Sequence, residues 1–202
     1  EGLSEALTSS RRIVKSAFGD DTLYAERIIP HARHIEVQLL ADAYGNVLAL
    51  GERECSIQRN YQKLIEESPA PGLSDELRWA LVQAAIALAS SSKYQGAGTV
   101  EFLVDSIGNY YFIEANSRLQ VEHPVTEMVT GYDIVQAQIR LAAGERLPHH
   151  GLWPHFRGAA IECRIYAEDP YRNWAPSPGT ITEFHAPGGD GIRLDSAIYP
   201  GM

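Results

Sequence analysis

Polar side chains recur at every second position of the segment FIEANSRLQVEHP, residues 112–124. The recurring residues are Glu114, Asn116, Arg118, Gln120 and Glu122. Because side chains alternate between the two faces of a strand, an extended backbone would line up all five on one face. The first carboxylate and amide are metal-type ligands, and the arginine and amide that follow suit an anion. The segment therefore predicts a reaction site along a strand, although alternation alone equally fits an ordinary amphipathic edge strand.

A hairpin just before this segment can supply a second carboxylate. The runs GTVEFLV (residues 98–104) and YYFIEAN (residues 110–116) bracket the polar turn DSIGN, which is typical of two paired strands. The pairing can bring Glu101 close to Glu114, with Asn116 two positions on and on the same face. Two carboxylates on neighbouring strands repel each other unless a cation lies between them. We therefore favour a magnesium site over a repelling surface pair.

The other elements predicted from the sequence are a mixture of helices and strands. Helical spacing predicts helices over residues 3–17, 75–91 and 132–143. Ser74, followed by two acids, is a good N-cap for the second of these, and Gly144 stops the third. Strands over residues 34–40 and 47–50 flank the hairpin turn DAYGN. The stretch ERLPHHGLWPHFRG has no periodicity and predicts a domain boundary, after which strands and turns dominate from Gly158 onward.

Composition narrows the class of protein. The chain has 202 residues, 45% of them hydrophobic and 21% charged, which is the balance of a globular protein. A formal net charge of -9 argues against a general nucleic-acid binder, which needs a basic face. Cys55 and Cys163 lack CxxC spacing and suit a reducing compartment. The sequence contains no apolar stretch of transmembrane length, and its opening lacks a signal-peptide core, so we expect a cytosolic or organelle-matrix protein.

Five ordered segments closely resemble the biotin carboxylase component of biotin-dependent carboxylases, which is an ATP-grasp enzyme. The segments are RHIEVQLLAD, GERECSIQRNYQKLIEESPAP, GTVEFLV, FIEANSRLQVEHPVTEMVTG and ECRIYAEDP with PSPGTITEFHAPGG. The resemblance runs along essentially the whole chain. It implies an α+β fold with a mostly antiparallel sheet, in which residues 1–150 are ATP-grasp domain and residues 151–202 begin the biotin carboxylase C-terminal domain. It also implies that the family's glycine-rich ATP lid precedes Glu1, so we expect the 202 residues alone to be inactive.

The resemblance implies a ligase that converts ATP and bicarbonate to carboxyphosphate and then carboxylates N1 of biotin on a carrier protein. The implied cofactors are ATP, Mg²⁺ or Mn²⁺, and carrier-bound biotin. The implied partners are a biotin carboxyl carrier protein or domain, a carboxyltransferase component and further copies of the chain, without nucleic acid or membrane. A cytoplasmic location is expected, or the mitochondrial matrix in a eukaryote. The final acceptor, whether an acyl-CoA, pyruvate or urea, is chosen by the carboxyltransferase.

The resemblance also assigns roles to residues by their matching positions. The residues that match the metal ligands are Glu101, Glu114 and Asn116. Those that match the ATP site are Glu26, Arg27, Ile29, His34, Gln58, Tyr61, Lys63, Glu101 and Glu114. Those that match the bicarbonate site are Lys63, Arg118, Gln120, Val121 and Arg193. The catalytic set is Lys63, Arg118, Glu122 and Arg193, in which Glu122 is the general base and Arg193 also contacts biotin.

Two positions depart from the family pattern. Tyr61 stands where many members carry histidine and Arg27 where many carry lysine, which points to nucleotide affinity rather than chemistry as the property that differs.

One alternative function is another ATP-grasp ligase, against which RLQVEHPVTE and the Arg193 segment argue. The other is a non-catalytic interaction module, which is hard to reconcile with an intact catalytic set.

Overall fold

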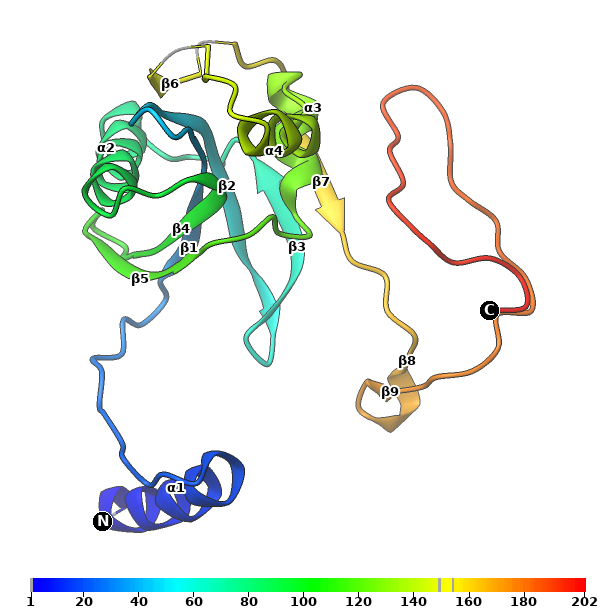
Figure 1. The fold of residues 1–202 in the computed structure, drawn as a ribbon. Helices are drawn as coiled ribbons and strands as arrows, with labels where there is room; N and C mark the ends of the chain where they lie inside the picture. The colour runs from blue at the N-terminus through cyan, green and yellow to red at the C-terminus, as the bar shows by residue number, and fades with distance from the viewer. Residues whose placement is uncertain (1, 149, 154) are drawn as a thin grey trace. The chain divides into compact units, whose positions relative to one another are not determined.

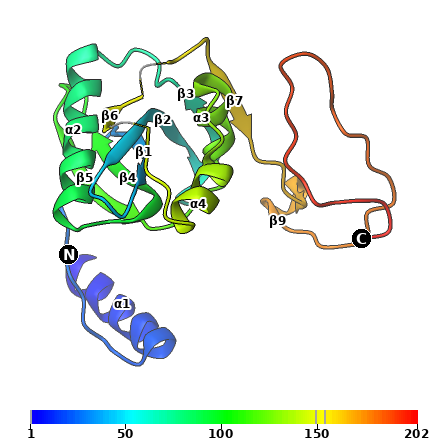
Figure 2. The same cartoon turned by 45° about the horizontal axis from the view of Figure 1, so that its top comes forward.

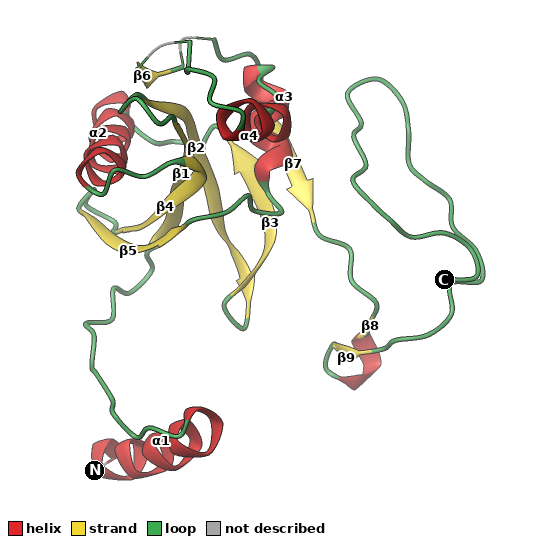
Figure 3. Cartoon of the chain, viewed as in Figure 1, coloured by secondary structure: helices red, strands yellow, loops and turns green. Residues whose placement is uncertain are grey.

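The computed structural model describes residues 2–148, 150–153 and 155–202, which form two compact units, Glu1–Glu162 and Cys163–Met202. Within the described residues, no helix is both long enough and apolar enough to cross a membrane. Figures 1 and 3 show the elements of the first unit in chain order. These are α1 (Gly2–Phe18), β1 (Arg33–Ala41), β2 (Val47–Arg59), β3 (Gln62–Ser68), α2 (Asp75–Ser91), β4 (Gly96–Val104), β5 (Tyr110–Asn116), α3 (His123–Thr130), α4 (Ile134–Ala142), β6 (Gly151–Leu152) and β7 (Ala160–Cys163).

A mainly antiparallel sheet forms the centre of the first unit. Its strands follow the order β5-β4-β1-β2-β3-β7, and β6 adds a short parallel pairing to β2. The β1–β2, β2–β3 and β4–β5 pairs are hairpins, while β4 reaches β1 through the connection that contains α2. The α+β class with a mostly antiparallel sheet is therefore confirmed.

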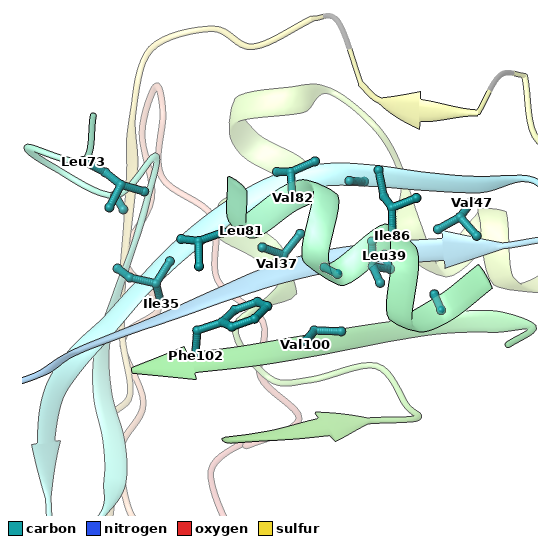
Figure 4. Packing of buried hydrophobic residues seen from close by; sticks show 14 of the residues in the cluster. Ile35, Val37, Leu39, Val47, Leu73, Leu81, Val82, Ile86, Val100 and Phe102 are labelled. Carbon is teal, nitrogen blue, oxygen red and sulfur yellow. The ribbon is translucent and has the colours of Figure 1, made fainter. Parts of the chain in front are cut away.

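The two faces of β1 have different partners because side chains alternate along a strand. Odd-numbered residues such as Ile35, Val37 and Leu39 pack with Leu81 and Ile86 of α2, and all five side chains are buried. Figure 4 shows this layer, with the helix side chains lying over the strands. Burial of these apolar side chains gives the sheet its main hydrophobic core.

The opposite face of the sheet is half apolar and half polar. Leu40 and Leu48 pack with Ile134 and Ala137 of α4, and α3 and α4 lie across the sheet from α2 (Figure 2). Two and four positions before Leu40, on the same face of β1, the buried residues are Gln38 and Glu36. Buried polar side chains need partners, so this end of the sheet is where a site is to be sought.

Local signals predicted several elements correctly. The helix expected over residues 3–17 is α1, and the helix expected over 132–143 is α4. The Ser74 hydroxyl accepts a hydrogen bond from Leu77 N, as an N-cap should, and α2 runs to Ser91. Both predicted hairpins are present.

The extended strand expected over residues 112–124 is wrong. Strand β5 ends at Asn116, a turn follows, and the chain enters helix α3 at His123. Pro124 occupies the first turn of α3, where its missing N–H costs nothing. Strand β3, and the part of β2 beyond residue 50, were not predicted from the sequence.

The second unit has little regular structure. Strands β8 (Glu168–Asp169) and β9 (Ala175–Pro176) pair around a single 3₁₀ turn, Pro170–Arg172, and loops make up most of the remainder. The expectation that residues 151–202 are the beginning of a C-terminal domain stays a prediction.

Candidate active site

Four polar side chains form a row across the sheet, because their strands pair residue to residue. Arg53 of β2 pairs with Glu36 of β1, Glu36 with Glu101 of β4, and Glu101 with Glu114 of β5. The predicted approach of Glu101 and Glu114 is thus confirmed. A row of three carboxylates on adjacent strands is strongly repulsive unless cations compensate it. We call Arg53, Glu36, Glu101 and Glu114 the carboxylate row.

Lys63 of β3 is the main compensating cation. Its Nζ donates to Glu36 Oε2 at 2.5 Å, to Glu101 Oε1 at 2.9 Å and to Glu122 Oε1 at 2.7 Å. The side chain is only 12% exposed, and the three carboxylates are almost fully buried. Burial alone would lower the pKa of Lys63, but the nearby carboxylates raise it, so the ammonium stays charged.

Glu101 lies at the centre of the row. Its Oε1 accepts hydrogen bonds from Asn116 Nδ2 and from Gln120 Nε2, both at 2.8 Å, in addition to Lys63. Its Oε2 contacts His34 Nε2 at 2.5 Å. Burial acts to raise the pKa of Glu101, but His34 and Lys63 outweigh it and lower that pKa to about 2. The carboxylate is therefore ionised at neutral pH.

The metal-type residues converge on one point. Asn116 Nδ2 lies 2.8 Å from Glu101 Oε1 and 3.2 Å from Glu114 Oε1, where it takes the place of a positive group between the two carboxylates. Rotation of the amide would present Asn116 Oδ1 beside both carboxylates, which gives three hard oxygen ligands. These residues therefore fit a magnesium ion. Glu114 is exposed.

Glu122 is placed by the start of a helix. It is the N-cap residue of α3 and is 2% exposed, which buries its carboxylate beside Lys63. Burial would raise the pKa of Glu122, but Lys63 and Arg53 outweigh it and lower that pKa. The cations that lower the pKa of Glu122 are Lys63 and Arg53, and Arg118 is not among them.

His34 and Gln58 form one short chain of contacts with the carboxylate row. Gln58 Nε2 lies 2.7 Å from His34 Nδ1 and also donates to Cys55 O at 2.7 Å. An amide N–H requires Nδ1 to accept, so His34 Nε2 carries the hydrogen that faces Glu101. The Gln58 position follows from the β2–β3 hairpin, where it pairs with Lys63.

Other predicted site residues lie at the edge of this cluster or outside it. Tyr61 is 98% exposed at the tip of the β2–β3 turn, with φ 63°. Arg118 and Val121 are exposed in the turn between β5 and α3, and Arg118 Nη2 lies 3.4 Å from Asn116 Oδ1. Gln120 in the same turn is buried.

We call Lys63 and its partners Glu36, Glu101 and Glu122 the Lys63 cluster. Two groups of predicted residues belong to other parts of the chain. Glu26, Arg27 and Ile29 lie in the loop between α1 and β1, where the first two are exposed. Arg193 belongs to the second unit, where its guanidinium contacts Asp195 at 2.9 Å. Their roles in nucleotide, bicarbonate or biotin binding stay predictions.

Glu36 and Arg53 were not predicted as site residues from the sequence. A continuous hairpin register from the DAYGN turn would pair Glu36 with Glu52, but a β-bulge between the Leu39–Ala49 and Val37–Glu52 pairs shifts it to Arg53. Gly51 lies in this bulge at φ 84°, and a Cβ there would come within 2.6 Å of Phe156. A glycine inside an apolar strand pattern is the signal that indicates such a bulge.

Known proteins resemble both parts of the chain. The family described as "Carbamoyl-phosphate synthase L chain, ATP binding domain" matches residues 1–150, and "Biotin carboxylase C-terminal domain" matches residues 162–202. A biotin carboxylase from Nostoc sp. is 55% identical over 184 residues, which cover 91% of this chain and 41% of that protein. The chain therefore spans less than half the length of that relative.

Solved structures agree with the sequence comparisons. The biotin carboxylase–β-γ-ATP complex from Campylobacter jejuni has a TM-score of 0.92 at 47% identity, covering 100% of this chain and 45% of that one. The biotin carboxylase domain dimer of Hydrogenobacter thermophilus 2-oxoglutarate carboxylase, in complex with MgADP, ADP and bicarbonate, has a TM-score of 0.93 at 49% identity. It covers 99% of this chain and 44% of that one.

Proposed function

Because the chain belongs to the biotin carboxylase family of ATP-grasp proteins, we propose that it carries the metal and bicarbonate sites, and part of the ATP site, of an enzyme that carboxylates biotin. The observation that carries this proposal is the Lys63 ammonium, which lies within 2.9 Å of Glu36, Glu101 and Glu122. A buried cation among ionised carboxylates suits phosphate and bicarbonate chemistry, because the ammonium can move from a carboxylate to pair with an incoming anion.

The complete protein would use ATP, bicarbonate, Mg²⁺ or Mn²⁺, and biotin on a carrier protein or domain. A carboxyltransferase component would receive the carboxyl group, and a second copy of the chain is a further expected partner. The cytoplasm, or the mitochondrial matrix in a eukaryote, is the proposed location. The chain spans 41% of its curated relative, so the expectation that 202 residues alone are inactive remains a prediction.

Glu101, Glu114 and Asn116 would hold the metal, which supplies positive charge to the phosphates when it is bound. His34, Gln58 and Tyr61 would line the nucleotide site with Glu26, Arg27 and Ile29. These two sets account for the oxygen ligands and the mixed polar lining that a metal–nucleotide complex needs.

Bicarbonate would bind where Arg118, Gln120 and the Val121 backbone offer donors near the Glu122 carboxylate. The planar guanidinium of Arg118 matches a planar oxyanion. Glu122 would accept the bicarbonate proton, which frees a bicarbonate oxygen to attack the terminal phosphate of ATP. Movement of Lys63 Nζ toward that phosphate would remove the cation nearest to Glu122, so the pKa of Glu122 would rise and the carboxylate would become a stronger base.

The deciding measurement is ADP release by the purified full-length protein with bicarbonate, in the presence and absence of free biotin. We expect release to depend on both biotin and bicarbonate. Bicarbonate-dependent release that biotin does not change, and that another acceptor increases, would indicate a different ATP-grasp ligase. Nucleotide binding without release under any of these conditions would indicate a non-catalytic module.

Replacement of Glu114 by Gln is expected to raise the magnesium concentration needed for half-maximal ADP release about tenfold, because the metal would lose one of its two charged ligands. Glu145→Gln provides the control, since Glu145 is also exposed but lies outside the carboxylate row. Magnesium titrations at saturating ATP measure both variants. Equal shifts in the two titrations would remove Glu114 from the metal site.

A further inference from the structure

Arg53 is a charged residue that the mechanism above does not use, although its side chain is fully buried in the site. Its exposed fraction is 0%, so it cannot meet a substrate directly. Its guanidinium donates five hydrogen bonds, to Glu36 Oε1 at 2.5 Å, Gln38 Oε1 at 2.8 Å, Thr126 Oγ1 at 2.9 Å, Thr99 Oγ1 at 3.3 Å and Gln120 Oε1 at 3.3 Å. Every donor direction of the planar fork is thus occupied.

Three of these contacts lead to groups proposed to bind or deprotonate bicarbonate. Glu36 uses its second oxygen to hold Lys63 Nζ. Gln120, with its Oε1 held by Arg53, turns its Nε2 toward Glu101. Thr126 lies in the first turns of α3, the helix whose N-cap residue is Glu122.

The fork geometry matters as much as the charge. A lysine at position 53 would keep a positive charge beside Glu36, but its three rotatable donors cannot reach five acceptors in fixed directions. The turn between β5 and α3 would then be held to the sheet by fewer bonds. A shift of about 1 Å in a positioning group can cost up to about 100-fold in rate.

We propose that Arg53 is a positioning residue for bicarbonate, which fixes Gln120 directly, Lys63 through Glu36, and Glu122 through Thr126. The inference rests on the proposed function for its kinetic consequence. Among the residues proposed for the nucleotide site, Arg53 reaches Lys63 only through Glu36, and the hydrogen bonds of its guanidinium go to none of His34, Gln58 and Tyr61. Loss of the Arg53 guanidinium should therefore raise the KM for bicarbonate more than the KM for ATP.

The test compares Arg53→Lys and Thr126→Val in the full-length protein. Both variants are expected to raise the KM for bicarbonate, about tenfold for Arg53→Lys and several-fold for Thr126→Val, with the KM for ATP changed less than about threefold. Thr130→Val is the matched control, because Thr130 is a buried threonine of α3 whose hydroxyl bonds Thr126 O rather than Arg53. It should lower Tm without separating the two KM values.

Thr126→Val keeps the test decisive if Arg53→Lys fails to fold. The proposal is overturned if Thr126→Val and Thr130→Val change the bicarbonate KM equally, or if a folded Arg53→Lys leaves that KM within about twofold of wild type. Hydrogen–deuterium exchange supplies a readout that does not need activity. We expect faster exchange in residues 117–125 of Thr126→Val than of Thr130→Val, and unchanged exchange there would also overturn the proposal.

These two readouts separate the failure of this inference from the failure of the proposed function. If wild-type protein releases no ADP with biotin and bicarbonate, the proposed function fails, and exchange in residues 117–125 still decides whether Arg53 positions the turn. If wild-type protein is active, the KM values and the exchange rates must both respond to the loss of the Arg53 contacts.

Discussion

Replacement of Glu122 by Gln in the full-length protein is expected to lower bicarbonate-dependent ADP release by about 100-fold to 10,000-fold, which is the range attributed to a positioned general base. Gln120 and Arg118 remain to bind the anion, but an amide cannot accept the bicarbonate proton. ATP affinity should stay nearly unchanged, because Lys63 keeps two of its three carboxylate partners. ADP release with and without biotin, together with nucleotide calorimetry, measures both effects.

Glu52→Gln is the matched control for this variant. Glu52 is a buried carboxylate of the same sheet, and Arg78 Nε donates to it at 2.8 Å, but it lies outside the Lys63 cluster. The control should lose stability while turnover changes little. If Glu122→Gln retains turnover within a few-fold of wild type, Glu122 is not the base.

Elements set by local signals could be predicted from the sequence. The approach of Glu101 to Glu114 follows from the DSIGN turn and strand alternation alone, and Asp105 accepts hydrogen bonds from Ile107 N and Asn109 N within that turn. Helix α2 likewise follows from its cap. These features depend on residues close in the sequence, which is where pattern and propensity carry most information.

Helix α3 could not be predicted in the same way. Its sequence HPVTEMVT contains four β-branched residues in eight, and proline is equally compatible with the end of a strand and the first turn of a helix. The helix is stabilised by burial of Val125 and Val129 against the rest of the unit rather than by its own propensity. Propensity was thus overridden by tertiary packing, and the alternation of residues 114–122 was a coincidence of a strand and a turn.

The setting of Lys63 depends on contacts far apart in the chain. Its three partners come from β1, β4 and the start of α3, and no local sequence pattern predicts that these residues contact one another. The family resemblance named Lys63, Glu101 and Glu122 as site residues with separate roles, and Lys63 contacts both carboxylates, but the resemblance did not name Glu36. The register that brings Arg53 beside Glu36 depends on one bulge, and the alternation of residues along the sequence does not predict the extra residue of that bulge.

Replacement of Lys63 by Met is expected to produce the largest loss of stability, because it leaves three buried carboxylates without the cation that they share. Loss of one partner from a buried ionic cluster typically costs about 3–5 kcal/mol. In the wild-type protein the pKa of Glu101 lies at about 2, below its ordinary value of 4.5. Its contribution to stability is therefore complete above pH 4.5 and is lost as the pH falls toward 2.

The variant should show the opposite dependence on pH. Without Lys63, Glu122 loses the largest interaction that lowers its pKa, and Arg53 and a backbone hydrogen bond remain against burial, so the pKa of Glu122 should rise above its ordinary 4.5. A raised carboxyl pKa means that the folded state takes up a proton more readily than the unfolded state, so acidification from about pH 7.5 to about pH 5.5 should restore part of the lost stability. Wild-type protein should gain nothing from the same change.

Urea unfolding of Lys63→Met and wild type at both pH values, without magnesium or nucleotide, measures this difference. Lys93→Met is the control, since Lys93 is an exposed lysine with no carboxylate partner among the described residues, and it should follow the wild-type curve. A loss below about 1 kcal/mol would place Lys63 among ordinary surface lysines. If Lys63→Met loses about 3–5 kcal/mol but its free energy of unfolding depends on pH as in wild type, the carboxylates of the cluster have another cation as partner. The proposed coupling between Lys63 and the basicity of Glu122 would then be wrong.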